Sequence, residues 1–335
     1  MSKIIIPPNY KSPLSLYHTQ IAIGFLKRNF EDNLAQALNL RRVSAPLFVE
    51  GHTGLNDNLS GTERPVDFDI KALDGQVEIV HSLAKWKRMA LARYNFPIGK
   101  GLYTDMNAIR RDDEIDNTHS IYVDQWDWEK VIAPTQRTMA YLQETVTKIV
   151  QAICHTSEAL KWKNPTLTHN LNHEVKFITS QELEDLYPTY TDKQKEDAIT
   201  KEYGTVFISQ IGAPLKSGKP HDHRAPDYDD WTLNGDILFW CPVLNKALEI
   251  SSMGIRVDDQ GLLRQLQAAD CNHRLALTYH KELLAGKYPL TIGGGIGQSR
   301  LSMLLLEKAH VGEVQVSVWD HDTYAACQNR GVELL

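Results

Sequence analysis

An arginine and a nearby row of acidic residues are the part of this sequence best suited to chemistry on a charged substrate. Arg110 begins the segment RRDDE, and the segment DQWDWE follows at residues 124–129. Because side chains alternate along a strand, Gln125, Asp127 and Glu129 should share one face, and the two tryptophans between them should point into packing. Acidic groups on one face suit an amino group or a metal ion, although a solvated sheet face has the same pattern.

A second charged group lies on an expected hairpin. Asp236 belongs to one strand, and Glu249 begins the next, in the segment EISSMGIR that ends at Arg256. Pairing of the two strands would bring both carboxylates close enough together to hold Mg²⁺. Two exposed acids on a hairpin are the alternative.

A glycine-rich segment, GGGIGQSR, runs from Gly293 to Arg300. We expect a turn between a short strand and a helix, in which the glycines let the backbone approach a planar ligand. Arg300 would then stack on an adenine ring or contact a phosphate, whereas a tight turn with a surface arginine is the alternative. The segment matches neither the dinucleotide pattern G-x-G-x-x-G nor the P-loop pattern.

The segment HDH at 221–223 offers a different chemistry. Two histidines one residue apart on a strand would share a face and could bind a metal together with the aspartates that follow. Prolines at 220 and 226 instead favour a loop that becomes ordered over a ligand. Both interpretations stay open at this point.

The composition is that of a globular chain without a broad basic surface. The 335 residues are 42% hydrophobic and carry a formal net charge of −6, which gives no reason to expect a nucleic-acid partner. No apolar run approaches the ~20 residues that a membrane span needs. The four cysteines form no C-x-x-C pair, which argues against a zinc knuckle or a disulfide framework. We therefore expect a cytoplasmic protein that binds neither nucleic acid nor membrane.

The elements that must position these residues follow from periodicity. Apolar residues at helical spacing predict one long amphipathic helix over 14–38 and another over 135–161. Strands are expected at 40–49, 66–72, 76–81, 118–129, 175–179, 205–211, 236–240, 247–257 and 290–292. Hairpin-like loops separate them as often as helices do, so we predict an α+β fold with a mixed, largely antiparallel sheet flanked by helices. Pro46 should keep its strand at an edge or an interface.

Seven segments, taken in order, point to a known family. They are NDNLSG (56–61), VHSLAKWKR (80–88), YVDQWDWE (122–129), RAPDYDDW (224–231), LNGDIL (233–238), EISSMGIRVD (249–258) and TIGGGIGQSRL (291–301). They resemble the ammonia-dependent asparagine synthetase A family, the aspartate–ammonia ligases, and the similarity extends from about residue 15 to 318. More broadly, the helix and strand before residue 50, the segment 110–129 and the segment 293–306 resemble the three signature motifs of class II aminoacyl-tRNA synthetases.

This resemblance implies a class II aminoacyl-tRNA synthetase-like catalytic core, with residues 1–335 forming a single catalytic domain. It implies ATP-dependent amidation of L-aspartate with ammonia to L-asparagine. ATP would adenylate the β-carboxylate, ammonia would displace AMP, and pyrophosphate would be released. The resemblance also implies Mg²⁺ as cofactor and a homodimer whose interface includes the strand that contains Pro46.

The resemblance also implies roles for single residues. The catalytic residues would be Arg110, Arg300 and Asp57. Arg110 would bind the α-phosphate and carboxylate oxygens as negative charge shifts during attack, and Arg300 would hold adenine or the triphosphate tail. Asp57 would receive ammonium and accept its proton. Asp236 and Glu249 would bind the metal. The expected ATP-binding residues are Arg110, Ser252, Arg256, Gly295 and Arg300. The expected substrate-binding residues are Ser82, Lys87 and Gln125 for the carboxylates, Asp127 and Asp229 for the ammonium group, and Arg224 for a carboxylate or phosphate.

Other functions remain open on the sequence alone. A regulatory paralogue would bind aspartate or nucleotide without turnover, but all of the named charged positions are present. A class II aminoacyl-tRNA synthetase would share the adenylation step. We expect no room for an anticodon-binding barrel before residue 15, and the acidic net charge also disfavours that alternative. The third alternative is a metal-dependent hydrolase that uses residues 221 and 223.

Overall fold

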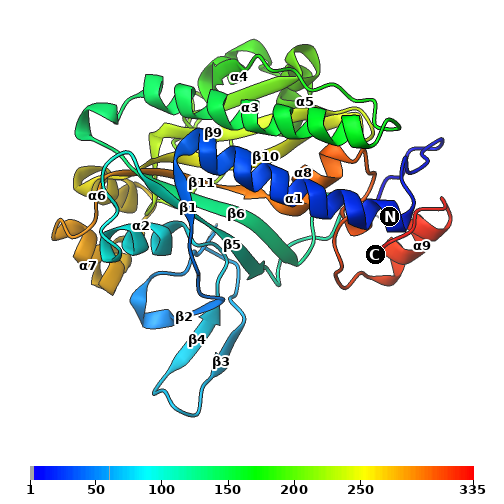
Figure 1. Cartoon of the computed structure of the whole chain (residues 1–335). Helices are drawn as coiled ribbons and strands as arrows, with labels where there is room; N and C mark the ends of the chain where they lie inside the picture. Colours follow the sequence, from blue (N-terminus) through cyan, green and yellow to red (C-terminus); the bar gives the residue numbers. More distant parts are fainter. Residues whose placement is uncertain (1–3, 60) are drawn as a thin grey trace.

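The computed structural model describes residues 4–59 and 61–335, so Ser60 of the segment 56–61 lies outside the described residues. In this part of the chain, eight strands form a central sheet with the order β1-β5-β6-β11-β10-β9-β8-β7 (Figure 1). These strands are β1 (Leu40–Arg42), β5 (Gly101–Ile109), β6 (Tyr122–Val131), β7 (Lys176–Thr179), β8 (Thr205–Ser209), β9 (Asp229–Cys241), β10 (Lys246–Arg256) and β11 (Thr291–Gly297). The pairs β1–β5 and β7–β8 at the edges are parallel, and the pairs between them are antiparallel. The predicted mixed, largely antiparallel sheet is confirmed.

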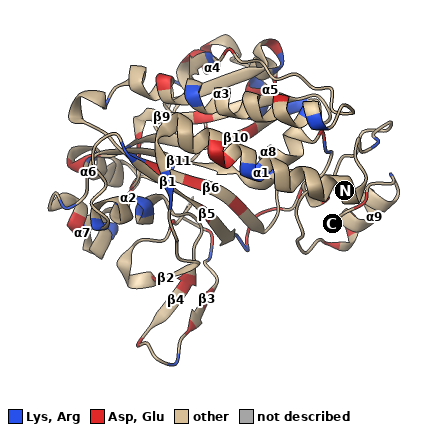
Figure 2. Cartoon of the chain, viewed as in Figure 1, with Lys and Arg blue, Asp and Glu red and all other residues tan. Residues whose placement is uncertain are grey.

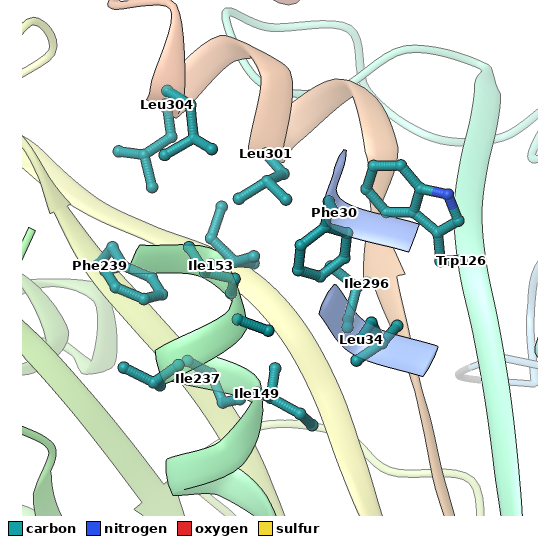
Figure 3. Close-up of a cluster of buried hydrophobic side chains, with 14 of the residues drawn as sticks. Phe30, Leu34, Trp126, Ile149, Ile153, Ile237, Phe239, Ile296, Leu301 and Leu304 are labelled. Carbon is teal, nitrogen blue, oxygen red and sulfur yellow. The ribbon is translucent and has the colours of Figure 1, made fainter. Parts of the chain in front are cut away.

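Three helices cover one face of this sheet: α1 (Leu16–Leu38), α3 (Met139–Lys163) and α8 (Gln298–Leu305). The hydroxyl of Ser15 caps α1 by accepting from the backbone N–H of His18, which satisfies one of the free donors at the helix start. Trp126 and Trp128 are fully buried and belong to this core, as their place in the strand predicted. Figure 3 shows part of the cluster, with Phe30, Leu34, Ile149, Ile153, Leu301 and Leu304 of the helices packed against Trp126, Ile237, Phe239 and Ile296 of the strands.

The opposite face of the sheet is covered less completely. Helix α2 (Ala84–Arg93) contacts β6 and β11 there. Its side chains Trp86 and Leu91, with Leu83 just before the helix, form a second core with residues of β5. Helices α4 (Ser180–Leu186) and α5 (Asp192–Tyr203) pack near β7 and β8. The helices α6 (Asp259–Ala268), η3 (Asn272–Ala276) and α7 (Thr278–Leu284) form a further group at one end of the sheet.

A small sheet of β2 (Phe48–Glu50), β4 (Gln76–Ile79) and β3 (Asp67–Asp69) projects from the body of the molecule (Figure 1). The strand expected over 40–49 is therefore wrong as one element, because β1 and β2 belong to different sheets. Pro46 lies between them, at the point where the chain leaves the large sheet. Proline has no backbone N–H to continue the ladder, which accounts for the break.

The short helix α9 (His321–Gln328) follows the core near the carboxyl end of the chain. Within the described residues, none of the helices has both the length and the apolar composition needed to cross a bilayer.

Candidate active site

A cavity of about 540 Å³ opens on the face of the large sheet that faces away from α1 and α3. Strands β6, β10 and β11 line it, together with α2, the segment 110–124 and the segment 223–229. Figure 2 shows acidic positions along β6 and basic positions on α2. The cavity wall includes these predicted site residues: Asp57, Ser82, Lys87, Arg110, Gln125, Asp127, Arg224, Asp229, Glu249, Ser252, Arg256, Gly295 and Arg300. Asp236 lies behind the wall, where it forms an ion pair with Arg224.

The glycine segment forms part of the floor of this cavity, so the turn predicted for it is wrong. Gly293, Gly295 and Gly297 lie in β11, directly opposite Glu129, Asp127 and Gln125 of β6. A Cβ at Gly293 would collide with the Glu129 carboxylate, and a Cβ at Gly295 would lie 2.7 Å from Asp127 Oδ1. The glycines therefore leave room for polar side chains that lie across the strand from β6. The apolar Ile292 and Ile296 face the core instead.

Lys87 and Asp127 form a buried pair on the cavity floor. The ammonium group of Lys87 lies 3.1 Å from Asp127 Oδ2 and donates to the carbonyl of Gly294 at 2.9 Å. Burial lowers the pKa of Lys87, while the neighbouring Asp127 works in the opposite direction. Asp127 Oδ1 is buried, and no described residue forms a hydrogen bond with it. A buried oxygen of this kind is a place where a ligand donor would be strongly favoured.

Arg256 crosses the same floor and is held between two carboxylates. Its guanidinium donates to Glu129 at 2.7 to 3.1 Å and also to Asp229. Burial alone would raise the pKa of Glu129, but Arg256 and Lys87 hold it below its ordinary value. Burial raises the pKa of Asp229 despite Arg256 and Arg224. In this arrangement Arg256 holds the two acidic residues in place. Its contact with ATP stays a prediction.

Asp57 reaches the cavity from the loop before β3. Its Oδ2 accepts from the hydroxyls of Ser82 at 2.9 Å and Tyr228 at 3.1 Å, and its Oδ1 accepts from the backbone N–H of Leu59 at 2.9 Å. Ser82 had been expected to bind a substrate carboxylate, but its hydroxyl donates to Asp57 here. Tyr228 was missed in the sequence, although it lies within the segment RAPDYDDW, because a phenol adds no charge to the pattern.

The two predicted catalytic arginines both line the cavity and approach it from different elements. Arg110 follows β5, and its guanidinium donates to the carbonyl of His81 at 3.2 Å. Arg300 lies in the first turn of α8, donates to the carbonyl of Glu249 at 3.2 Å and lies 4.0 Å from its carboxylate. Both hold their positions mainly through neutral carbonyls, which leaves much of their positive charge available to an anionic ligand.

Asp236 is buried and Glu249 is half-buried on the neighbouring strand, with a β-bulge between Glu249 and Ser251. Burial and the charge of Glu249 raise the pKa of Asp236 to about 7, even though Arg224 opposes that shift. Among the described residues, no group of three or more His, Cys, Asp or Glu is arranged to hold a metal. The pair nevertheless suits Mg²⁺, which binds in many proteins through one or two carboxylates together with phosphates and waters. A divalent cation there would relieve the repulsion between the two acids.

The histidines at 221 and 223 diverge. His221 is buried and pairs with Glu196 of α5 at 3.2 Å, whereas His223 is exposed at the cavity. The two histidines therefore do not share a strand face on which they could bind one metal. Residues 221–223 instead lie in a loop, as the flanking prolines favoured.

Known proteins resemble this chain along nearly its whole length. A model of the Aspartate-ammonia ligase family matches residues 17–331. The chain is 57% identical to the aspartate–ammonia ligase of Clostridium perfringens strain SM101, over 100% of both chains. It is 59% identical to that of Clostridium tetani, over 99% of this chain and 98% of the relative.

Solved structures are similar in fold. Asparaginyl-tRNA synthetase from Pyrococcus horikoshii complexed with asparaginyl-adenylate superposes with a TM-score of 0.61 at 17% identity, over 94% of this chain and 74% of that one. The asparaginyl-tRNA synthetase of Entamoeba histolytica gives 0.61 at 15% identity, over 89% and 67%. The predicted class II aminoacyl-tRNA synthetase-like core is confirmed by these neighbours. Matched by the family model over most of its length and by relatives that share more than half of its residues, the chain belongs to the aspartate–ammonia ligase family of enzymes.

Proposed function

We propose that this enzyme makes L-asparagine from L-aspartate, ammonia and ATP through a β-aspartyl-adenylate, releasing AMP and pyrophosphate. The observation that supports the proposal is the Lys87–Asp127 pair on the cavity floor, where Asp127 Oδ1 has no hydrogen-bond partner in the described part of the chain. An amino acid with one ammonium and two carboxylates needs both signs of charge at one place. The family membership of the chain supports the same substrate.

The proposed roles of the substrate-binding residues follow from their charges. Asp127 and Asp229 would accept from the α-ammonium of aspartate, while Lys87 and Gln125 would bind its carboxylates. Lys87 is the buried cation nearest to Asp127 and can contact a carboxylate placed over the floor. Arg224, with Asp236 as its present partner, would contact a carboxylate or a phosphate once that partner binds a cation.

ATP would lie across β10 and β11, where Gly295 and Ser252 face each other on paired strands. Arg110 and Arg300 would stabilise the charge that develops on the α-phosphate as the carboxylate attacks it, which is the kind of preorganised electrostatic contribution that dominates many enzymes. Arg256 would support this region through Glu129 and Asp229. Asp236 and Glu249 would hold Mg²⁺, which when bound neutralises phosphate charge.

The second step would use Asp57. Ammonium gives one proton to the Asp57 carboxylate, and the lone pair of the resulting ammonia forms a C–N bond with the activated carbonyl carbon. The C–O bond to AMP breaks, and AMP leaves with its electron pair. The nitrogen loses a further proton to solvent as the amide forms, so both charge and atoms balance. Exclusion of water from the cavity would protect the adenylate from hydrolysis.

We further propose that residues 1–335 act as one catalytic domain within a homodimer. A cytoplasmic location stays a prediction from the sequence. The alternatives can be told apart by their products. A regulator would form no product, and a synthetase would form aminoacylated tRNA.

A product assay tests the proposal. Purified protein incubated with aspartate, ammonium and Mg²⁺-ATP should form asparagine, AMP and pyrophosphate in equal amounts. ADP and phosphate in place of AMP and pyrophosphate would contradict the adenylate. Ligand binding without products would indicate a regulator, and aspartate transferred to added tRNA would indicate a synthetase. Omission of Mg²⁺ with a chelator present should abolish turnover, and addition of Mg²⁺ should restore it.

A further inference from the structure

Asp57 differs from Asp127, Asp229 and Asp236 because its partners are neutral. Asp127, Asp229 and Asp236 are each paired with a lysine or an arginine. Among the described residues, Asp57 accepts from one backbone N–H and two hydroxyls, and none of them forms an ion pair with it. It is 4% exposed and lines the cavity. A buried carboxylate with neutral donors keeps its negative charge uncancelled and attracts a small cation.

Tyr228 supplies one of the two hydroxyl donors, and its backbone is fixed on both sides. The N–H of Val257 donates to the carbonyl of Tyr228 at 2.9 Å. The side-chain amide of Gln265 in α6 donates to the carbonyls of Pro226 and Asp229, at 3.0 and 2.8 Å. The phenol is therefore held at the cavity wall by contacts that do not depend on a bound substrate.

The residue before Tyr228 anchors the same segment in the interior. Asp227 is fully buried and lies within 3.0 to 3.3 Å of Lys85, Arg274 and His280. Burial would raise the pKa of Asp227, but Lys85, the hydrogen bond with His280 and Arg274 hold it far below its ordinary value. Side chains from three elements, α2, η3 and α7, thus meet at the carboxylate of the residue next to Tyr228 in the chain, and a segment anchored in this way positions its side chains with little freedom.

The ring and the hydroxyl of Tyr228 have separate contacts. The guanidinium of Arg256 lies 5.7 Å from the ring centroid, a cation–π geometry, while the hydroxyl donates to Asp57. Burial, together with the charge of Asp57, raises the pKa of the phenol well above its ordinary value, so the hydroxyl keeps its proton over the working pH range. Replacement by phenylalanine would remove the Asp57 contact and leave the ring packing in place.

We propose that Tyr228 is a positioning residue for the ammonia half of the reaction, where its hydroxyl fixes the Asp57 carboxylate to receive ammonium. The inference rests on the proposed function, because it needs an adenylate step and an ammonia step that can be measured apart. It assigns the phenol no part in adenylation. Loss of the hydroxyl should therefore weaken the use of ammonium and spare the activation of aspartate.

The two steps are separated by two measurements on the full-length enzyme. Aspartate-dependent exchange of labelled pyrophosphate into ATP, without ammonium, reports adenylation, and asparagine formation reports the complete reaction. Tyr228→Phe should keep the exchange rate within about 2-fold of wild type. Its KM for ammonium should rise roughly 10- to 100-fold, the usual effect of losing a hydrogen bond to a charged group. Tyr288→Phe, which removes a hydroxyl that donates to Glu282 away from the cavity, should change neither measurement.

A double-mutant cycle with Asp57→Asn completes the test. If Tyr228 acts through Asp57, the double variant should have the ammonium KM of Asp57→Asn alone, because the two changes remove the same interaction. Additive effects would overturn the inference, as would an unchanged ammonium KM or an equal loss of exchange in Tyr228→Phe. Absence of exchange in the wild-type enzyme would instead overturn the proposed function. Thermal unfolding of each variant identifies any that fails to fold. If Tyr228→Phe fails to fold, Asp57→Asn alone tests the inference, because an unchanged ammonium KM in that variant would also contradict it.

Discussion

Each charged side chain on the cavity floor depends on a buried partner of opposite sign. Arg256 lies between Glu129 and Asp229, and Lys87 lies beside Asp127. Attraction between such groups is strong in the low-dielectric interior, but an isolated member costs more free energy than the pair returns. The site should therefore be sensitive to removal of one member of a pair, even where that member touches no substrate.

Glu129→Gln is the sharpest test of this sensitivity. The substitution keeps the shape of the side chain but leaves Arg256 with one carboxylate fewer, so the free energy of unfolding should fall by on the order of 3–5 kcal/mol. The matched control is Glu144→Gln, since Glu144 pairs with Lys148 on an exposed helix surface and should contribute less than about 1 kcal/mol. Urea unfolding of the two variants and the wild type measures both values. Equal losses would contradict the argument.

The ion pair between Glu129 and Arg256 also predicts how the loss of unfolding free energy in Glu129→Gln depends on pH. Arg256 and Lys87 hold the pKa of Glu129 below its ordinary 4.5. A carboxylate with a lowered pKa stabilises the folded state fully above that ordinary value, and the contribution is lost as the pH falls through the lowered pKa. The gap in unfolding free energy between wild type and Glu129→Gln should therefore be constant near neutral pH and shrink on acidification below about 4.5.

At the scale of elements, β11 determines the shape of the site. Its alternate glycines lie under the polar residues of β6, and its isoleucines lie in the core. A period of two residues therefore separates ligand space from packing along a single strand. Helix α8 follows at once and brings Arg300 to the same cavity.

Gly295→Ala should damage the site more than the fold. The added Cβ would collide with the Gln125 side chain and lie 2.7 Å from Asp127 Oδ1, so both side chains must move. We expect the KM for aspartate to rise at least 10-fold, with a stability cost of about 1–3 kcal/mol typical of overpacking. Gly24→Ala in α1 is the control, because its Cβ would have no atom closer than 3.8 Å and alanine favours helix. Steady-state kinetics that found both variants alike would refute this role for Gly295.

Local patterns predicted the elements whose period is unambiguous. The two long helices predicted over 14–38 and 135–161 are α1 and α3, and the alternation in β6 correctly divided Trp126 from Asp127. Strand β5 was missed, because its sequence has no clean alternation of polar and apolar residues. The glycines of β11 were misassigned because glycine is typical of turns, and the requirement for empty space above the strand comes from β6, which is distant in sequence.

The site as a whole is assembled from segments far apart in the chain. Asp57 and Arg300 line the same cavity, and so do residues from most segments that resemble the ligase family. Similarity in sequence order identified these segments, but it could not indicate that Ser82 and Tyr228 both donate to Asp57. Contacts of that kind depend on how loops from separate elements meet, and this is settled only by the packing of the complete chain.

The predicted homodimer is the remaining test at the scale of the whole molecule. The segment after Pro46 exposes Leu47 and Phe48, by 50% and 40% of their surfaces, which is unfavourable unless a partner covers them. Light scattering coupled to size-exclusion chromatography should give twice the mass of one chain for the wild type. The Leu47→Asp substitution should lower the measured mass towards that of a single chain. Leu186→Asp is the matched control, since Leu186 is 55% exposed at the end of α4 and should leave the mass unchanged.

Assembly and activity should be linked through the sheet. Strand β1, just before this segment, pairs with β5, and β5 pairs with β6, which carries Asp127. A partner that supports β1 would therefore also hold the cavity floor, so the Leu47→Asp variant should lose turnover in parallel with its dimer fraction as the protein is diluted. A wild-type enzyme that keeps full specific activity while sedimenting as a single chain would exclude a dimer as part of the working site.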